Sequence, residues 1–324
     1  MDFELNADQL LIVDAVQSIC SRYRDLPDER RRDYQFFSHE MQRDLQESGF
    51  LDMIRSGYSP LEAALVLYET STVPAVVEVA VSALVAPQLI DRELPGPVAI
   101  LSGDLSRPQR MLPVARTVLV ELPDDVLLLS VDADNVIPHE TFLAYPYGCF
   151  RELPDLRSGE RLGAAALVKL RQWRRVALAL ECAAAARAAT DFTVDHVKER
   201  HVFGKPIAAF QAVQHRLAQC HVIASGLRWL GLYAAWSGAA ADADLAAAYA
   251  QQHIHKLVFD LHQFNGGMGL TCEQKLHLWT YRLRALQAEA GGVNAAALDY
   301  ANARWPERTA DAARGSAPAH RALA

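Results

Sequence analysis

The spacing of apolar residues predicts that the chain begins with helices. Leu10, Val13, Val16 and Ile19 recur at helical intervals. They follow Asn6-Ala7-Asp8-Gln9, where Asn and Gln three residues apart form the polar pattern of a capping box. Three further apolar stretches have helical character, at 37–47 (ending before Gly49), 61–68 and 76–89. We therefore predict an N-terminal helical domain over residues 1–92.

The middle of the chain has a different pattern. Eight of the fifteen prolines lie between Pro95 and Pro154, and helix interiors exclude proline. Short runs rich in leucine and β-branched residues alternate there with turn residues; they are VAIL (98–101), TVLVEL (117–122), VLLLSV (126–131) and TFLAY (141–145). This alternation predicts a small antiparallel β domain over residues 93–157.

A helical pattern returns in the last half of the chain. Alanine is dense, and one apolar stripe with spacings of three and four residues runs from Val213 to Gly231. Small residues allow close approach of helix axes, so we predict an antiparallel four-helix bundle over residues 158–303. Residues 304–324 are polar and aperiodic and are predicted to be a disordered tail. The fold class is thus mainly α with a small central β domain.

Composition narrows the choice of function and location. The chain of 324 residues carries 32 basic and 39 acidic residues, and its net charge of −7 argues against nucleic acid as a partner. It has no long uncharged apolar run, so we predict no membrane span, and its first twenty residues lack the basic region of a signal peptide. The five cysteines lack metal-ligand spacing, which predicts no metal site and a cytoplasmic protein.

Two motifs in the predicted bundle bring ligand-binding groups together. Arg200-His201-Val202-Phe203-Gly204-Lys205-Pro206 predicts a helix that ends near Arg200, breaks at Gly204 and restarts at Pro206. Such a bend presents a guanidinium suited to phosphate groups. For the bend alone, the favoured interpretation is an ordinary helix–loop–helix whose arginine pairs with a carboxylate. The second motif, Gln263-Phe264-Asn265-Gly266-Gly267-Met268-Gly269, has glycines that let a ligand approach the main chain, and a plain helix cap uses the same glycines.

Together the two motifs resemble the C-terminal domain of the acyl-CoA dehydrogenases, and the opening MDFELNADQLLIVDAV resembles that family's start. The family consists of flavoproteins with an N-terminal helical domain, a middle β domain and a C-terminal four-helix bundle. In the family, the matching motif residues contact the pyrophosphate and adenosine end of FAD that is held mainly by a neighbouring subunit. The resemblance therefore implies a set of FAD contacts in this chain, namely Arg200, Phe203, Gln211, Gln263, Gly266 and Gly267.

The chain departs from the family where the catalytic glutamate is expected. At one family position it has Ala290 or Gly291, and at the other it has Arg174, which stays protonated. Glu289 lies one residue from the first position, and one helical residue turns a side chain by about 100°, so we expect it to point elsewhere. Glu181 lies two helical turns from the second, and we expect both acids to be solvated or ion-paired. The family's flavin-ring strand motifs are also missing from the middle domain.

These departures resemble the shorter, degenerate subunit of actinobacterial heteromeric acyl-CoA dehydrogenases, α2β2 assemblies that act on CoA thioesters of steroid side chains. The resemblance implies a homologous partner subunit that supplies the catalytic Glu, an acyl-CoA substrate, and electron-transfer flavoprotein or a similar acceptor. This chain then has no catalytic residue of its own. Two alternatives stay open: a homomeric acyl-CoA dehydrogenase that uses Glu289 as base, and a non-enzymatic helical scaffold derived from the family.

Overall fold

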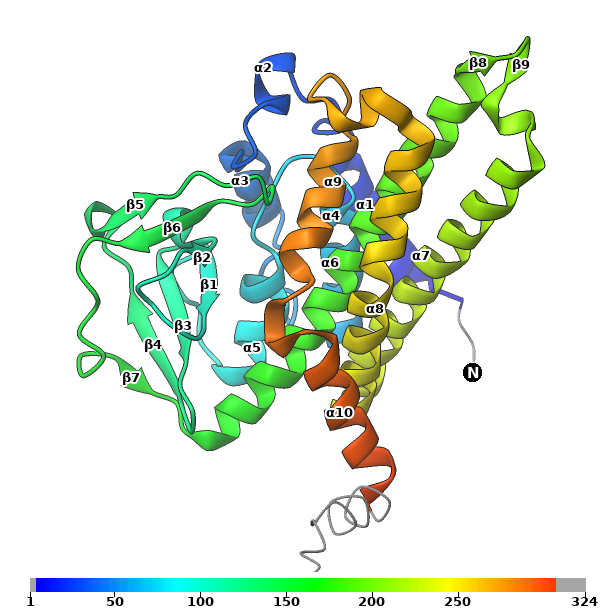
Figure 1. The fold of residues 1–324 in the computed structure, drawn as a ribbon. Helices are drawn as coiled ribbons and strands as arrows, with labels where there is room; N and C mark the ends of the chain where they lie inside the picture. The colour runs from blue at the N-terminus through cyan, green and yellow to red at the C-terminus, as the bar shows by residue number, and fades with distance from the viewer. Residues whose placement is uncertain (1–3, 307–324) are drawn as a thin grey trace, which may run out of the picture.

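The computed structural model describes residues 4–306, which begin with a group of helices (Figure 1). These are α1 (Ala7–Ser21), α2 (Asp28–Arg31), α3 (His39–Glu47) and α4 (Pro60–Ser71). The predicted capping box starts α1: the Asn6 side chain accepts the N–H of Gln9 at 2.8 Å, and the Gln9 side chain accepts the N–H of Asn6 at 3.1 Å. The cap therefore fixes the first helix where the sequence pattern predicts it.

The helix predicted over 76–89 begins four residues later than predicted, at Ala80. It consists of a π-helix, η1 (Ala80–Val85), continued by α5 (Ala86–Leu89). Val76 instead pairs with Phe37 in an isolated parallel β-bridge, which keeps the backbone before Glu78 extended. The Glu78 carboxylate then accepts the N–H groups of Val81 and Ser82, so it caps the π-helix.

The β domain contains two small sheets. Strands β1 (Val98–Leu101), β3 (Thr117–Glu121), β4 (Val126–Ser130) and β7 (Glu160–Arg161) form the first, in that order. Strands β2 (Gln109–Arg110), β6 (Tyr147–Phe150) and β5 (Val136–Pro138) form the second. Three of the four predicted strands are present at the expected positions. Strand β7, which pairs with β4, lies just beyond residue 157, the predicted end of the β domain.

Two predictions about this domain are wrong. The run TFLAY (141–145) forms bends and not a strand, because its Ala144 has a left-handed backbone with φ of 53°. The first sheet is also not wholly antiparallel, since β1 runs parallel to β3. A parallel pair needs a crossover connection, and here residues 102–116, which include β2, provide it.

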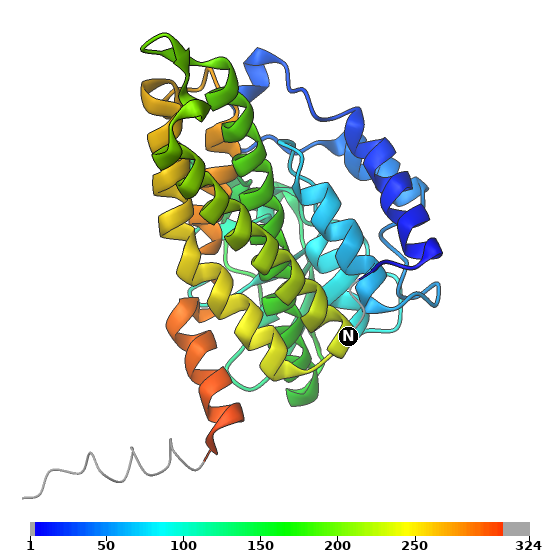
Figure 2. The same ribbon diagram turned by 90° about the vertical axis from the view of Figure 1, so that its right-hand side faces the viewer.

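Long helices form the predicted bundle. They are α6 (Ala164–Glu199), α7 (Gln211–Ser237), α8 (Ala240–Asn265) and α9 (Leu276–Leu286), followed by α10 (Gly292–Arg304), which packs against α8. Figure 2 shows α7 and α8 side by side along the length of the bundle. An ideal Cβ on Gly231 would lie 2.9 Å from the Leu180 side chain, so a larger residue would force Leu180 to shift where α7 approaches α6.

The predicted stripe on α7 faces the core, with Leu217, Cys220, Ala224, Leu227 and Gly231 buried. The restart of the helix is later than predicted: Pro206 belongs to a hairpin of β8 (His201–Val202) and β9 (Lys205–Pro206), and α7 begins at Gln211. Within residues 4–306, no helix has the length and hydropathy needed to cross a bilayer. The tail predicted over 304–324 lies outside the described residues from position 307 onward.

Candidate functional site

Both sequence motifs lie at the same end of the bundle. The hairpin of β8 and β9 follows the end of α6, and the glycine segment η5 (Gly266–Leu270) follows the end of α8 (Figure 1). Two contacts join these ends: Asn265 donates to the Thr193 hydroxyl at 2.9 Å, and the Arg216 guanidinium lies 4.8 Å from the centre of the Phe264 ring. The fold therefore brings together two motifs that are about sixty residues apart in sequence.

The predicted contact residues at this end are open to solvent. All six are exposed, and Phe203 keeps 92% of its surface accessible at the tip of the hairpin. Its φ of 55°, followed by a φ of 80° at Gly204, gives the left-handed turn that a tight hairpin requires. The side chains of Arg200, Gln211 and Gln263 form no hydrogen bond or ion pair with any residue between 4 and 306. An exposed aromatic ring and unpaired donors are groups available to a ligand or to another chain.

The glycine segment provides accessible backbone beside these donors. Gly266 has φ 57° and ψ −146°, a conformation that favours glycine, and an added Cβ at Gly266 or Gly267 would meet no atom within 4 Å. Asn265 is 3% exposed, and its Oδ1 has no hydrogen-bond partner within the described part of the chain. This end of the bundle therefore combines free donors, approachable main chain and one unsatisfied acceptor.

A cavity of about 550 Å³ lies elsewhere, at the junction of the β domain and the bundle. Arg110 of β2 is one of the residues that line it. The guanidinium donates to both oxygens of Glu181 on α6, at 2.9 and 3.3 Å, and its Nε lies 2.7 Å from Glu289 Oε1. The carboxylates of Glu181 and Glu289 are thus held by one cation that comes from the β domain.

Aromatic and charged neighbours complete this group, which we call the Arg110 cluster (Arg110, Tyr145, Arg174, Glu181 and Glu289). The Arg110 guanidinium lies 4.6 Å from the centre of the Tyr145 ring, and the Tyr145 hydroxyl donates to Glu181 at 3.2 Å. Arg174 approaches Glu289 at 3.7 Å and pairs with Glu121 at 3.1 Å. Burial alone would lower the pKa of Arg110, but Glu181 and Glu289 raise that pKa well above its ordinary value.

Glu289 lines this cavity together with Arg174 and Glu181. Helix α9 ends at Leu286, and residues 289–291 form a short 3₁₀ turn with Ala290 at φ 53°. A rotation of about 100° per helical residue therefore does not describe the backbone at Glu289. Both acids are ion-paired, one of the two states expected from the sequence.

Sequence reasoning missed Arg110, Tyr145 and Glu78. Arg110 lies in the segment SRPQRML, which carries no recognisable motif, and its partners are 71 and 179 residues away. Glu78 belongs to an apolar stretch that we predicted to be helix. Its charge within that stretch, VVEVAV, was the available signal. These residues acquire a role only through tertiary contacts.

Comparisons with known proteins agree with the fold. Residues 163–303 match the family model of the acyl-CoA dehydrogenase C-terminal domain. Over these residues the bundle is similar to that domain, and the described chain as a whole has the acyl-CoA dehydrogenase fold that the sequence predicts. The ChsE4-ChsE5 complex from Mycobacterium tuberculosis has a chain with 19% identity and a TM-score of 0.76, covering 98% of this chain and 100% of that one.

Sequence relatives point to the same family. The acyl-CoA dehydrogenase IpdE2 of Mycolicibacterium smegmatis is 26% identical over 159 residues, which are 48% of this chain and 51% of the relative. IpdE2 of Mycobacterium tuberculosis is 31% identical over 107 residues, 33% of this chain and 34% of the relative. The Tcur3481-Tcur3483 steroid ACAD has a TM-score of 0.73 at 20% identity, with 93% of this chain and 99% of that chain covered. The matched segments span about half or less of these sequence relatives.

The first prediction concerns Arg110. The substitution Arg110→Met leaves Glu181 and Glu289 without their shared cation, in a site where Glu181 is 7% exposed. Removing one partner of a buried ion pair typically costs about 3–5 kcal/mol, so we expect a free energy of unfolding lower by that order in urea denaturation. Arg92→Met breaks the exposed Arg92–Glu160 pair and serves as the control, with little expected change. Equal stability of the two variants would contradict the role given to Arg110.

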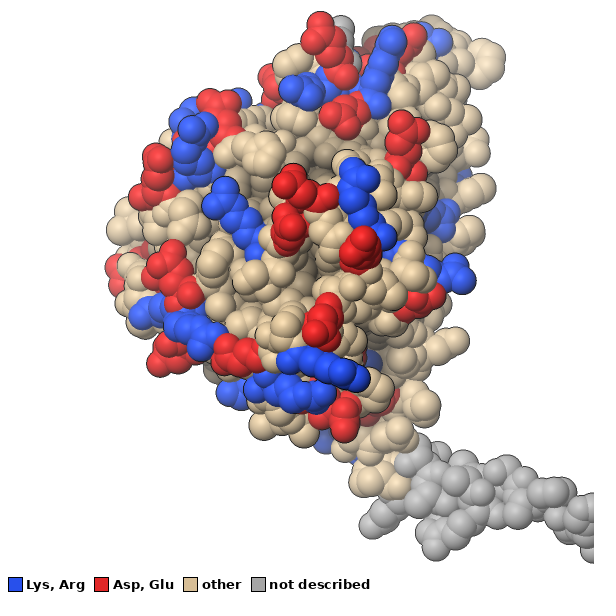
Figure 3. Space-filling model, turned by 90° about the vertical axis from the view of Figure 1, so that its left-hand side faces the viewer, with Lys and Arg blue, Asp and Glu red and all other residues tan. Residues whose placement is uncertain are grey.

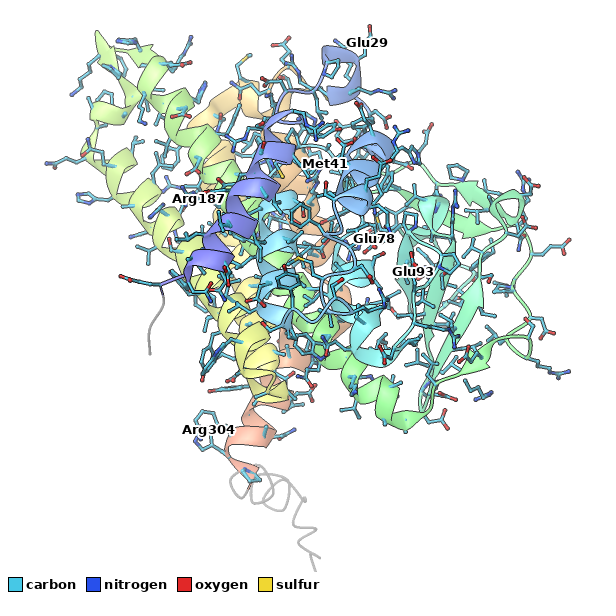
Figure 4. The ribbon with its side chains drawn as sticks, turned by 180° about the vertical axis from the view of Figure 1, so that it is seen from behind. Glu29, Met41, Glu78, Glu93, Arg187 and Arg304 are labelled. Atoms are coloured by element: carbon cyan, nitrogen blue, oxygen red, sulfur yellow. The ribbon has the colours of Figure 1, made fainter. Side chains whose placement is uncertain are left out.

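The second prediction concerns Glu78, which Figure 4 labels in the interior beside the β domain. Burial raises the pKa of this carboxyl from 4.5 to about 7, although the Ser82 and Val81 hydrogen bonds oppose the shift. The folded state then keeps a proton that the unfolded state has lost between pH 4.5 and pH 7. Stability is therefore lost as pH rises through this window, by about 3 kcal/mol for a shift of this size.

Glu78→Gln removes this titration while keeping an acceptor for the N–H of Val81. We expect the free energy of unfolding of the original protein to fall relative to that of the variant between about pH 5 and about pH 7.5, as measured by urea denaturation at each pH. A difference between the two proteins that is independent of pH would show that Glu78 is not protonated in the folded state.

Proposed function

We propose that this protein is one subunit of a heteromeric FAD-dependent acyl-CoA dehydrogenase. The assembly would introduce an α,β double bond into a CoA thioester, with a steroid side chain or a similarly bulky acyl group as substrate. This chain would contribute contacts to FAD at a subunit interface, and a homologous partner in an α2β2 assembly would contribute the catalytic Glu. The single observation that carries the proposal is the contrast between the open motif end of the bundle and the closed Arg110 cluster.

The open end has the chemistry that the adenosine diphosphate part of FAD requires. Arg200 offers a guanidinium with no protein partner between residues 4 and 306, and such a group gives short, charge-assisted hydrogen bonds to a pyrophosphate. Gln211 and Gln263 offer free amides, and Gly266 and Gly267 allow close approach of the main chain. Phe203, which is 92% exposed, offers an aromatic face that a second chain or a ring would cover. The chemistry of these residues therefore fits contacts to an FAD that is held mainly by another subunit.

The Arg110 cluster supports the second half of the proposal. A catalytic carboxylate must reach the substrate α-proton with a free oxygen lone pair. Glu181 accepts from Arg110 and Tyr145, and Glu289 is held by Arg110 and Arg174. Neither acid is free to move toward a substrate without breaking a partly buried ion pair, which favours a base in the partner. Bound FAD would supply the acceptor for the substrate hydride.

The names of similar structures agree with an assembly of two different chains. ChsE4-ChsE5 and Tcur3481-Tcur3483 are both named as pairs, and the second is described as a steroid ACAD. A further structural neighbour, with a TM-score of 0.76 at 18% identity, is named as the electron transferring flavoprotein of Acidaminococcus fermentans. We include such a flavoprotein, or a similar acceptor, among the proposed partners, and we place the assembly in the cytoplasm.

One observation favours the homomeric alternative. Glu289 lines the cavity next to Glu181, so a rearrangement of the short turn at 289–291 would bring a carboxylate to the substrate without a partner. This alternative predicts flavin and activity from the chain alone. The non-enzymatic scaffold predicts no flavin in any combination, and the unpaired donors of Arg200, Gln211 and Gln263 argue against it.

The third prediction tests the FAD contact. In the complex with the partner subunit, Arg200→Ala should reduce the FAD content, because a charge-assisted hydrogen bond is worth roughly 1.5–3 kcal/mol. The measurement is the flavin absorbance per complex after gel filtration at a fixed FAD concentration. Arg116→Ala, at an exposed arginine of the β domain, is the matched control and should keep its flavin. A variant complex that keeps all its FAD and loses only turnover would contradict the assignment.

The fourth prediction tests the absence of a base in this chain. General-base catalysis typically supplies about 10²–10⁴-fold, so loss of a true base is conspicuous. We expect Glu289→Gln, assembled with an unaltered partner, to keep turnover in a dye-reduction assay within a small factor at equal flavin content. The glutamate of the partner should instead be indispensable. Loss of turnover in Glu289→Gln with FAD still bound would favour the homomeric alternative.

A further inference from the structure

A second cavity, of about 680 Å³, lies between the N-terminal helices and the bundle. It shares no lining residue with the cavity of the Arg110 cluster, and the proposed function makes no use of it. Its walls come from α1, α4, α6, α7 and α9, and three arginines face it: Arg24, Arg187 and Arg228. Figure 4 labels Arg187 next to α1, on the side of the molecule seen from behind.

The arginines of this cavity have few protein acceptors. Arg228 lies over two aromatic rings, 5.1 Å from the centre of Tyr68 and 4.7 Å from that of Trp229. Within the described residues, the guanidinium groups of Arg228 and Arg24 make no hydrogen bond and no ion pair. Only Arg187 has a carboxylate partner, Asp191 at 2.6 Å. Two of the three cations are therefore available to a ligand.

The acids of the cavity do not balance these cations. Asp191 is already paired with Arg187, and Glu69 accepts a hydrogen bond from Gln17 at 3.0 Å. Glu69 and Asp191 are the two acids of the cavity, against three arginines. Donors exceed acceptors in the cavity, so its polar groups are best satisfied by a ligand rich in acceptors.

The remaining walls are aromatic. Tyr68 and Trp229 lie beneath Arg228, and Phe192 and Trp279 form a second pair with ring centres 5.8 Å apart. The Trp279 indole donates to the Thr72 carbonyl at 2.9 Å, which fixes the orientation of its ring. Flat apolar walls beside unpaired guanidinium groups suit a planar ring that carries an anionic group.

We propose that this cavity is a second ligand site, for a small molecule whose phosphate or carboxylate pairs with Arg228 and Arg24 and whose planar ring lies against the aromatic walls. A cavity of about 680 Å³ is within the usual range of small-molecule sites. The proposed site does not involve FAD or the proposed dehydrogenation, so a measurement of ligand binding tests it directly.

Intrinsic fluorescence provides the test, because Trp229 and Trp279 are two of the five tryptophans and both line the cavity. The full-length protein is titrated separately with adenosine monophosphate, benzoate, adenosine and inorganic phosphate. We expect a saturable change in tryptophan fluorescence with adenosine monophosphate or benzoate, and at least tenfold weaker binding of adenosine. The first two ligands distinguish a phosphate from a carboxylate, and inorganic phosphate measures the contribution of the ring.

Arg228→Met keeps an unbranched apolar stem over the two rings and removes the charge. We expect it to bind the preferred anion at least tenfold more weakly, whereas the control Arg116→Met should bind it like the original protein. Circular dichroism checks that both variants are folded. The proposal is overturned if neither ring-bearing anion gives a saturable change, if adenosine binds as well as its monophosphate, or if Arg228→Met binds unchanged. None of these results depends on flavin content, so they leave the proposed function untouched.

Discussion

The Arg110 guanidinium, shared between Glu181 and Glu289, is the interaction that joins the β domain to the C-terminal bundle. It connects strand β2 to helix α6 and to the turn that follows α9, segments that are 71 and 179 residues away in sequence. Because the cluster is largely buried, none of its charges can lose its partner without a large desolvation cost. The same ion pairs therefore fix the position of the β domain on the bundle and the orientation of the charged side chains that line the cavity.

The polar groups of the Arg110 cluster differ in their pairing from those at the far end of the bundle. At the junction of the β domain and the bundle, the carboxylates of Glu181 and Glu289 are both paired with Arg110. At the far end of the bundle, the donors of Arg200, Gln211 and Gln263 have no protein partner in the described chain. Figure 3, which views the molecule from the β-domain side, shows acidic and basic side chains intermixed over that face. The proposed function rests on this contrast between paired acids at one end of the bundle and unpaired donors at the other.

The sequence predicted those features that depend on neighbouring residues. The capping box of Asn6 and Gln9, the strand at 98–101 and the buried stripe of α7 all follow from local spacing, and all are present. Features that depend on tertiary contacts were not predicted. The left-handed backbone at Ala144 removed a predicted strand, and the one at Ala290 turned Glu289 into the cavity. Arg110 has no local signal, since its role depends entirely on distant partners.

The most direct test of the account is the amount of FAD per chain after purification of this protein alone and after co-expression with a homologous acyl-CoA dehydrogenase subunit. The visible spectrum gives the flavin, and quantitative amino-acid analysis gives the protein. We predict a colourless protein when the chain is alone and a yellow complex containing both chains after co-expression. A stable yellow homomer with full flavin occupancy would contradict the account.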